Sequence, residues 1–316
     1  MKIDLSGNKR SATRESYAKE LVALGKEHDD LYVLDADLAG ATKTSVFQKE
    51  FPDRHIDCGI AEADMMGIAA GMSTTGIIPF ASTFAMFAAG RAYEQIRNSI
   101  GYPHLNVKIA ATHAGISVGE DGATHQCCED IALMRTIPGM VVLNPCDEVE
   151  ARAAIRAAYL YKGPVYIRLG RLAIPVIFDE DDYSFEIGKG ILLKEGKDIT
   201  IFATGLEVYE SLIAAQMLEK DGINAEVIDI HTIKPIDRDI ITESLKKTGR
   251  AVTVEEHSVI GGLYGAVCEV AASECPCRIE AIGINDTFGH SGPAMDLIKE
   301  FGLDGESVYN KIKSLF

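Results

Sequence analysis

Short apolar runs alternate with amphipathic segments along most of the chain. Residues 13–24 have a helical period, with Tyr17, Leu21 and Leu24 on one face, and the apolar run at 31–37 follows. Short, continuously apolar strands between helices are typical of a parallel sheet that is covered on both faces. The alternation continues with expected helices at 61–72, 84–100 and 147–161, and expected strands at 77–81, 107–112, 140–144 and 164–169.

A second series of the same kind follows an acidic, aperiodic stretch at 178–186. Its expected strands are 198–205, 225–233, 251–257 and 278–284, and its expected helices are 206–222, 237–249 and one from 262. A chain of 316 residues suits two domains of ordinary size. We therefore predict an α/β protein with two three-layer α/β/α domains, residues 1–185 and 186–316.

Charge and composition narrow the functional classes. The formal net charge is −16, with 47 acidic and 31 basic residues, which disfavours nucleic-acid and anionic membrane partners. We see no signal peptide and no uncharged apolar run near the roughly 20 residues that span a bilayer. Seven scattered cysteines without CxxC spacing indicate free thiols, not a metal site. We expect a cytoplasmic enzyme.

The first candidate site is a carboxylate beside aromatic residues. Glu62 begins the helix at 61–72, among Ala, Met, Ile and Gly, where it either serves the helix dipole or shares a proton with a ligand nitrogen. Phe80, Phe84 and Phe87 lie at a strand-to-helix turn and either fill the core or stack on a flat heterocycle. The second alternative needs a carboxylate nearby, and Glu62 offers one.

The second candidate is the loop at 113–125, bracketed by His113 and His125. It contains GISVGEDG, in which Gly119 and Gly122 would let the backbone turn and present Asp121 to a hydroxyl group. A solvated surface loop is the alternative. Mixed His and Asp side chains suit hydroxyl-bearing ligands such as sugars.

Arginines at a strand end form the third candidate. Arg168 and Arg171 in YIRLGR either bind phosphate or carboxylate or balance neighbouring acids, and Arg14 is a weaker third cation. In the second half, EEHSVIGGLYG contains His257, which we expect to pack at an interface.

Taken together, these motifs resemble transketolase, specifically its pyrimidine-binding and C-terminal domains. The resemblance covers nearly the whole chain and is carried by GIAEADMMGIAAGM, STFAMF, ATHAGISVGEDGATHQ and IPGMVVLNPCDEVE. It implies that Glu62 bonds the aminopyrimidine of thiamine diphosphate, that Phe84, Phe87 and Ile60 line the cofactor pocket, and that Asp37 approaches the cofactor across an interface.

The resemblance also implies a sugar-binding set. His113 and His125 would be catalytic and would contact hydroxyls of the ketose donor, Asp121 would bind the hydroxyl next to the carbonyl, and Arg171 with Arg14 would hold the sugar phosphate. The chain departs from the family at Gly90, where many relatives have a tyrosine, and at Ala41, where a serine often helps bind phosphate.

No GDG sequence occurs in the chain, although the family binds the diphosphate and its Mg²⁺ through that motif. The resemblance therefore implies one subunit of a split transketolase. Such a subunit would have no metal ligands of its own, and it would pair with an N-terminal subunit and with itself in an α2β2 assembly. The implied reaction transfers a two-carbon ketol unit between sugar phosphates, as in the pentose phosphate pathway.

Three alternatives stay open. The beta subunit of a 2-oxo-acid dehydrogenase has the same layout and cofactor, and deoxyxylulose-phosphate synthase shares parts of the motifs. A noncatalytic regulatory or assembly subunit would keep the fold without activity. The paired histidines around GEDGATHQ favour ketose chemistry.

Overall fold

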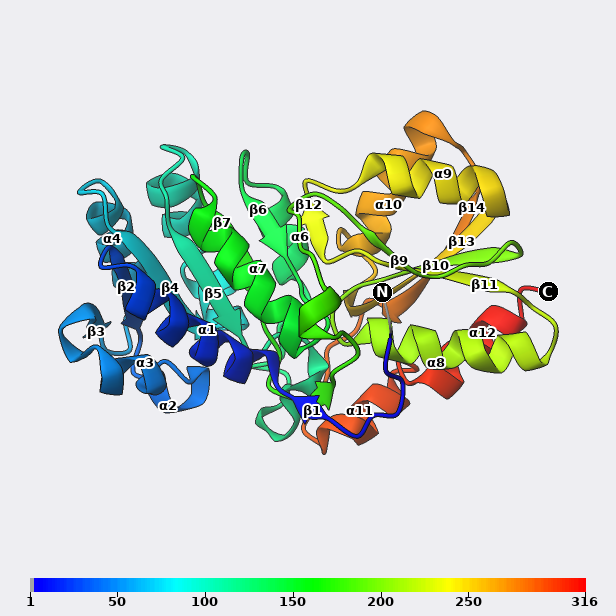
Figure 1. Cartoon of the computed structure of the whole chain (residues 1–316), viewed down its shortest axis with the longest axis horizontal. Helices are drawn as coiled ribbons and strands as arrows, with labels where there is room; N and C mark the ends of the chain where they lie inside the picture. Colours follow the sequence, from blue (N-terminus) through cyan, green and yellow to red (C-terminus); the bar gives the residue numbers. More distant parts are fainter. Residues whose placement is uncertain (1–2) are drawn as a thin grey trace.

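The computed structural model describes residues 3–316 and contains two α/β/α units side by side (Figure 1). The first unit holds a seven-stranded sheet in the order β12-β6-β7-β5-β4-β2-β3, parallel except for β12. Its strands are β2 Leu31–Asp35, β3 His55–Asp57, β4 Ile78–Phe84, β5 Lys108–Thr112, β6 Val141–Leu143, β7 Val165–Arg168 and β12 Thr232–Lys234.

Helices cover both faces of this sheet. One face carries α1 Thr13–Glu27, α3 Ser45–Glu50 and α7 Glu148–Leu160. The other carries α4 Glu62–Ser73, α5 Tyr93–Gln95 and α6 Asp130–Arg135, together with two π-helical segments, η2 Met86–Arg91 and η3 Ile96–Gly101. Short helical turns, α2 Ala39–Thr42 and η1 Pro52–Arg54, join the first strands.

The second unit holds a five-stranded sheet in the order β14-β13-β10-β11-β9, parallel except for β9. Its strands are β9 Ile191–Lys194, β10 Ile199–Ala203, β11 Ala225–Asp229, β13 Arg250–Ser258 and β14 Arg278–Ile284. Helices α9 Arg238–Thr248 and α10 Leu263–Glu274 lie on one face, and α8 Glu207–Lys220 and α12 Gly305–Lys313 on the other (Figure 1). The predicted fold class is confirmed.

Four small elements lie near the junction of the two units. β1 Arg10–Ser11 pairs with β8 Ile174–Pro175, and α11 Ala294–Glu300 packs on η4 Ile116–Asp121. The acidic stretch expected as a linker contains only a short turn, η5 Glu180–Asp182. One apolar core runs from Met65 of the first unit to Phe202 and Leu263 of the second, so the two units pack together through buried side chains.

Two sequence-based boundaries are wrong. The expected strand 225–233 is two strands in different sheets, because the chain crosses between the units at Ile230 and His231, whose backbone groups bond Ala203 and Asn144 respectively. The expected helix at 84–100 starts only after Phe84, which still belongs to β4, and it contains both π-helical segments. No helix within residues 3–316 is long and apolar enough to cross a bilayer.

Candidate active site

Glu62 is buried at the start of α4 and is paired with a cation that the sequence analysis missed. Its side chain is 2% exposed, and Nη1 of Arg91 donates to both of its carboxylate oxygens at 2.8 Å. The guanidinium carbon of Arg91 also lies 4.4 Å from the centre of the Phe87 ring. The carboxylate and the aromatic residues are therefore neighbours, as the sequence suggested, but Arg91 stands between them.

Two of the three candidate aromatics belong to this site. The rings of Phe84 and Phe87 are nearly parallel, with centroids 5.6 Å apart, and His113 stacks on Phe84 at 3.9 Å. His125 meets Phe87 edge to face at 5.3 Å. Phe80 instead faces Tyr17 in the core. We call Glu62, Phe84, Phe87, His113 and His125 the site face.

His113 is held as a neutral imidazole. Nη1 of Arg14 lies 3.1 Å from its Nε2, and because arginine only donates, Nε2 carries no proton. The proton is on Nδ1, which donates to Oγ1 of Thr112 at 2.9 Å. Burial and the charges of Arg14 and Arg171 lower the pKa of His113 to about 3. The ring stays uncharged at neutral pH.

Cations gather at this corner of an otherwise acidic chain. Arg14, Arg171 and Lys43 all act on His113 electrostatically. Arg14 also donates to the carbonyl of Ala41, whereas Arg171 bonds Glu120 at 3.0 Å and the carbonyl of Val118. Lys43 gave no signal in the sequence, because only the turn after α2 brings it here. Such a group of cations suits a phosphate.

Thr42, which lies beside the position of the expected phosphate-binding serine, is engaged elsewhere. Its hydroxyl donates to the buried carboxylate of Asp35 at 2.8 Å, and Thr44 donates to the same oxygen at 2.9 Å. The threonines therefore fix the end of β2.

The glycine-rich loop is fixed by the second unit. Gly119 and Gly122 have positive φ angles of 84° and 75°, so they do turn the backbone sharply. A Cβ atom on Gly122 would lie 2.4 Å from Oγ of Ser291. Nε2 of Gln126 donates to the carbonyl of His290 at 2.9 Å. The loop thus needs its glycines for domain packing as well, while Asp121 stays exposed.

Asp37 and Ile60 lie on neighbouring loops at one edge of the first sheet. Oδ1 of Asp57 accepts hydrogen bonds from the backbone of Asp37 and of Gly59, at 3.1 and 2.8 Å. Asp37 is exposed with a positive φ, and Ile60 is 76% exposed immediately before α4. Both side chains are free to contact another molecule beside Glu62.

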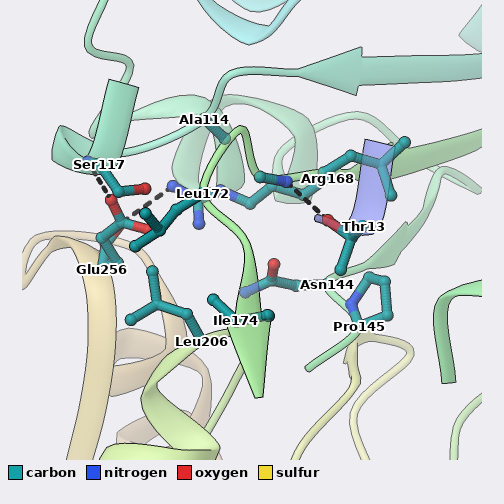
Figure 2. Close-up of a pocket in the computed structure, with 12 residues that line it drawn as sticks. Thr13, Ala114, Ser117, Asn144, Pro145, Arg168, Leu172, Ile174, Leu206 and Glu256 are labelled. Atoms are coloured by element: carbon teal, nitrogen blue, oxygen red, sulfur yellow. Dashed lines mark hydrogen bonds between the residues drawn. The ribbon is translucent and has the colours of Figure 1, made fainter. Parts of the chain in front are cut away.

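Arg168 does not belong to the candidate anion site. It is 4% exposed, its Nε donates to Asp130 at 2.9 Å, and its Nη2 donates to the carbonyl of Glu256 at 2.9 Å. A carboxylate oxygen of Glu256 in turn accepts from the backbone of Ser117 at 2.6 Å (Figure 2). We call Arg168, Asp130, Glu256 and Ser117 the interdomain network. The phosphate role considered for Arg168 is wrong, and its alternative, pairing with acids, is correct.

A narrow cavity of about 20 Å³ adjoins this network between the two units, with Thr13 and Asn144 in its wall (Figure 2). That volume has room for a single water molecule. Burial raises the pKa of Glu256 to about 7. The cavity therefore belongs to the packing of the units and is too small for a substrate.

His257 packs at the junction, as expected. It is fully buried, its Nδ1 lies 2.7 Å from the carbonyl of Ser258, and its Nε2 accepts from the backbone of Ala132 in the first unit. Burial lowers its pKa to about 4.

One buried group within residues 3–316 has the composition of a metal site. Ligand atoms of Cys146, Glu150 and Asp229 lie within 4.8 Å of one another. Burial raises the pKa of Asp229 well above its ordinary value, and the neighbouring Glu150 raises it further. The backbone of Cys146 and the hydroxyl of Tyr183 already donate to Glu150. The raised pKa favours the protonated form of Asp229, which lowers the negative charge of this group without a metal ion.

Comparison with known proteins agrees with this geometry. Residues 9–176 match the family model of the transketolase pyrimidine-binding domain, and residues 188–308 match that of the transketolase C-terminal domain. A protein of Methanocaldococcus jannaschii, named as a transketolase C-terminal section, is 54% identical over 95% of this chain and 94% of its own length. A 6-deoxy-6-sulfo-D-fructose transketolase subunit of Clostridium sp. strain MSTE9 is 42% identical over 93% of this chain and 91% of its own length.

A solved structure of a split gene transketolase, described as an inactive β4 tetramer, superposes with a TM-score of 0.87. It is 52% identical and the match covers 96% of this chain and 97% of that one. The stacked Phe84 and Phe87 beside a buried glutamate lie within the matched pyrimidine-binding domain. The sequence-based resemblance to the C-terminal subunit of a split transketolase is thus confirmed, and the chain belongs to the transketolase family.

Proposed function

We propose that this chain is the subunit of a transketolase that binds the pyrimidine ring of thiamine diphosphate and the sugar substrates. The enzyme would transfer a two-carbon ketol unit from a ketose phosphate to an aldose phosphate, as in the pentose phosphate pathway. The observation that carries the proposal is the buried Glu62 carboxylate beside two nearly parallel phenylalanine rings. When bound, thiamine diphosphate supplies the carbon nucleophile that accepts the ketol unit.

The residues of the site face fit a flat, nitrogen-containing ring. Phe84 and Phe87 offer aromatic faces for stacking. Glu62, which is removed from water, offers a carboxylate that can exchange a proton with a ring nitrogen. Ile60 and Asp37 line the open edge beside it, where they would contact the rest of the cofactor.

The polar groups next to this pocket fit a sugar phosphate. We assign hydroxyl contacts of the sugar to His113 and to His125, which lies beside it across Phe84. His113 would bind a hydroxyl through Nε2, in place of its present contact with Arg14. We assign Asp121 to a further hydroxyl. Arg14 and Arg171 would hold the anionic end of the sugar. The similar Clostridium subunit is named for a sugar with an anionic group at one end.

We assign the Mg²⁺ ion and the diphosphate to an N-terminal transketolase subunit, because this chain contains no GDG sequence. Large exposed apolar side chains lie on both units, including Ile60 at 76%, Ile260 at 63% and Phe288 at 87% exposure. Phe288 borders a mostly apolar groove of about 760 Å³. Apolar surface of this kind is typical of protein interfaces. It supports pairing with other protein chains, which we propose are the N-terminal subunit and a second copy of this chain in a cytoplasmic α2β2 assembly.

The test is reconstitution with an N-terminal transketolase subunit, thiamine diphosphate and Mg²⁺. Xylulose 5-phosphate with ribose 5-phosphate should give product, and pyruvate should not. Turnover with pyruvate alone would contradict the proposal and favour the 2-oxo-acid dehydrogenase or deoxyxylulose-phosphate synthase alternatives. A complex that assembles but turns over neither substrate would favour the noncatalytic alternative.

A further inference from the structure

Arg91 occupies the space beside Phe87 and Glu62 in which a bound aromatic ring would stack. Its Nη1 takes both oxygens of Glu62, and its guanidinium carbon is 4.4 Å from the centre of the Phe87 ring. A guanidinium is planar, donates hydrogen bonds to carboxylates and stacks on aromatic faces. The guanidinium of Arg91 shares these three properties with an aminopyrimidine. It also contacts Glu62 and Phe87, the two residues that we assign to the cofactor ring.

The two members of this ion pair differ sharply in exposure. The Glu62 side chain is 2% exposed, whereas that of Arg91 is 50% exposed. Full hydration of Arg91 therefore costs Arg91 itself little, and the cost of separating the pair falls on Glu62. A buried carboxylate that loses its only cation is strongly disfavoured unless another donor replaces it. Departure of Arg91 is thus expected only when another donor arrives.

The backbone explains why Arg91 reaches this position. Phe87 and Arg91 lie four residues apart in η2, a π-helical segment with nearly the same number of residues per turn. Their side chains therefore leave the segment on the same side. The segment ends at Arg91, and the N–H of the next residue, Ala92, donates to the carbonyl of Phe87 and closes the wide turn.

We propose that Arg91 is a displaceable placeholder for the cofactor ring. In the cofactor-free subunit it covers Phe87 and neutralises Glu62, and it moves into solvent when the pyrimidine ring binds. Arg91 is then a positioning residue that sets the affinity for the cofactor, because the ring must displace it. This inference rests on the thiamine diphosphate site proposed above.

The first test measures binding, not turnover. Isothermal titration calorimetry of the reconstituted enzyme with thiamine diphosphate and Mg²⁺ would compare wild type, Arg91→Met, Arg91→Lys and the matched control Arg97→Met. Arg97 lies in η3 and is exposed, and its guanidinium donates to the side chain of the neighbouring Asn98. We expect Arg91→Met to tighten the Kd about tenfold, because the ring no longer competes with a cation. Arg91→Lys and Arg97→Met should stay within threefold of wild type.

The outcomes separate this inference from the proposed function. If wild type binds thiamine diphosphate but Arg91→Met binds with equal or weaker affinity, the placeholder role is wrong. Weaker binding would mean that Arg91 stabilises the cofactor complex, and equal binding would mean that it does not affect affinity. If wild type binds no thiamine diphosphate, the proposed cofactor site itself is wrong.

A second test needs no cofactor and covers the case in which Arg91→Met folds poorly. Urea unfolding of this chain alone would compare Arg91→Met, Glu62→Gln and the double variant. Arg91→Met should lower the urea midpoint, because it leaves Glu62 buried and unpaired, and adding Glu62→Gln should recover most of the loss. Additive effects of the two changes would show that the pair is uncoupled and would overturn the inference.

Discussion

The interdomain network and the site face each contain a buried carboxylate bonded by an arginine, but they differ in how completely their charges are paired. In the network, buried Arg168 and Asp130 are joined directly, and the charged groups are bonded from both units. On the site face, buried Glu62 depends on one half-exposed arginine, and Ile60 lies beside it in solvent. The charges of the network are paired within the chain, whereas the groups of the site face stay accessible to other molecules.

Complete pairing inside the chain marks structural charges in this fold, and incomplete pairing marks functional ones. Arg168 and Arg171 both lie at the carboxyl end of β7. Arg168 is buried, whereas Arg171 lies with the other cations near His113. Substitutions in the network should therefore change stability, and substitutions on the site face should change catalysis. The following predictions test that separation.

Glu62→Gln should have the largest effect. We expect kcat of the reconstituted enzyme to fall about 10³-fold, because an amide cannot exchange a proton with the cofactor. Steady-state kinetics with a ketose phosphate donor measures it, and Glu94→Gln is the control, since Glu94 is exposed on α5. Unchanged turnover in Glu62→Gln would remove Glu62 from the catalytic residues.

Arg168→Met should act on stability instead. Among residues 3–316 it leaves the buried carboxylate of Asp130 with the hydroxyl of Tyr166 as its remaining side-chain donor, which should cost about 3 kcal/mol of unfolding free energy. Urea unfolding of the isolated chain gives this value, and Arg152→Met, at a partly exposed ion pair, should cost much less. Equal losses in both variants would contradict the importance of the network.

Glu256→Gln should change how stability depends on pH. Burial raises the pKa of Glu256 from its ordinary 4.5 to about 7. The folded chain therefore binds a proton that the unfolded chain has lost between these values, and stability falls as pH rises from 4.5 through 7. Glutamine removes that loss, so the variant should gain about 2 kcal/mol relative to wild type between pH 5 and pH 8. Parallel pH profiles of the two unfolding free energies would refute this.

Glu120→Gln should have the smallest effect. Glu120 and Arg171 form an ion pair that is largely exposed to solvent, and such pairs are weak. Releasing Arg171 should lower the KM for the sugar phosphate by about twofold and leave kcat unchanged. A large fall in kcat would mean that Glu120 contacts the reacting atoms.

Sequence patterns predicted the architecture well because most strands are short, apolar and separated by helices. They also placed Glu62 beside Phe84 and Phe87, and the resemblance to transketolase added both histidines to the same site. In the structure all five lie near the carboxyl ends of parallel strands. Arg91 and Lys43 were missed because their positions depend on a π-helical turn and on a left-handed residue, neither of which has a sequence period. The division of 225–233 was missed because no glycine or proline interrupts the sequence AEVIDIHTI where the chain changes sheets.

The crossing at Ile230 and His231 has a consequence for how this chain can be cut. β12 comes from the second half but pairs with the outer edge of β6 in the first sheet. A fragment ending near residue 185 would expose that edge, and open strand edges recruit other chains into aggregates. Separately produced halves should therefore be poorly soluble. A first-half fragment supplied with a peptide of residues 230–236 should regain its edge strand β12 and become more soluble.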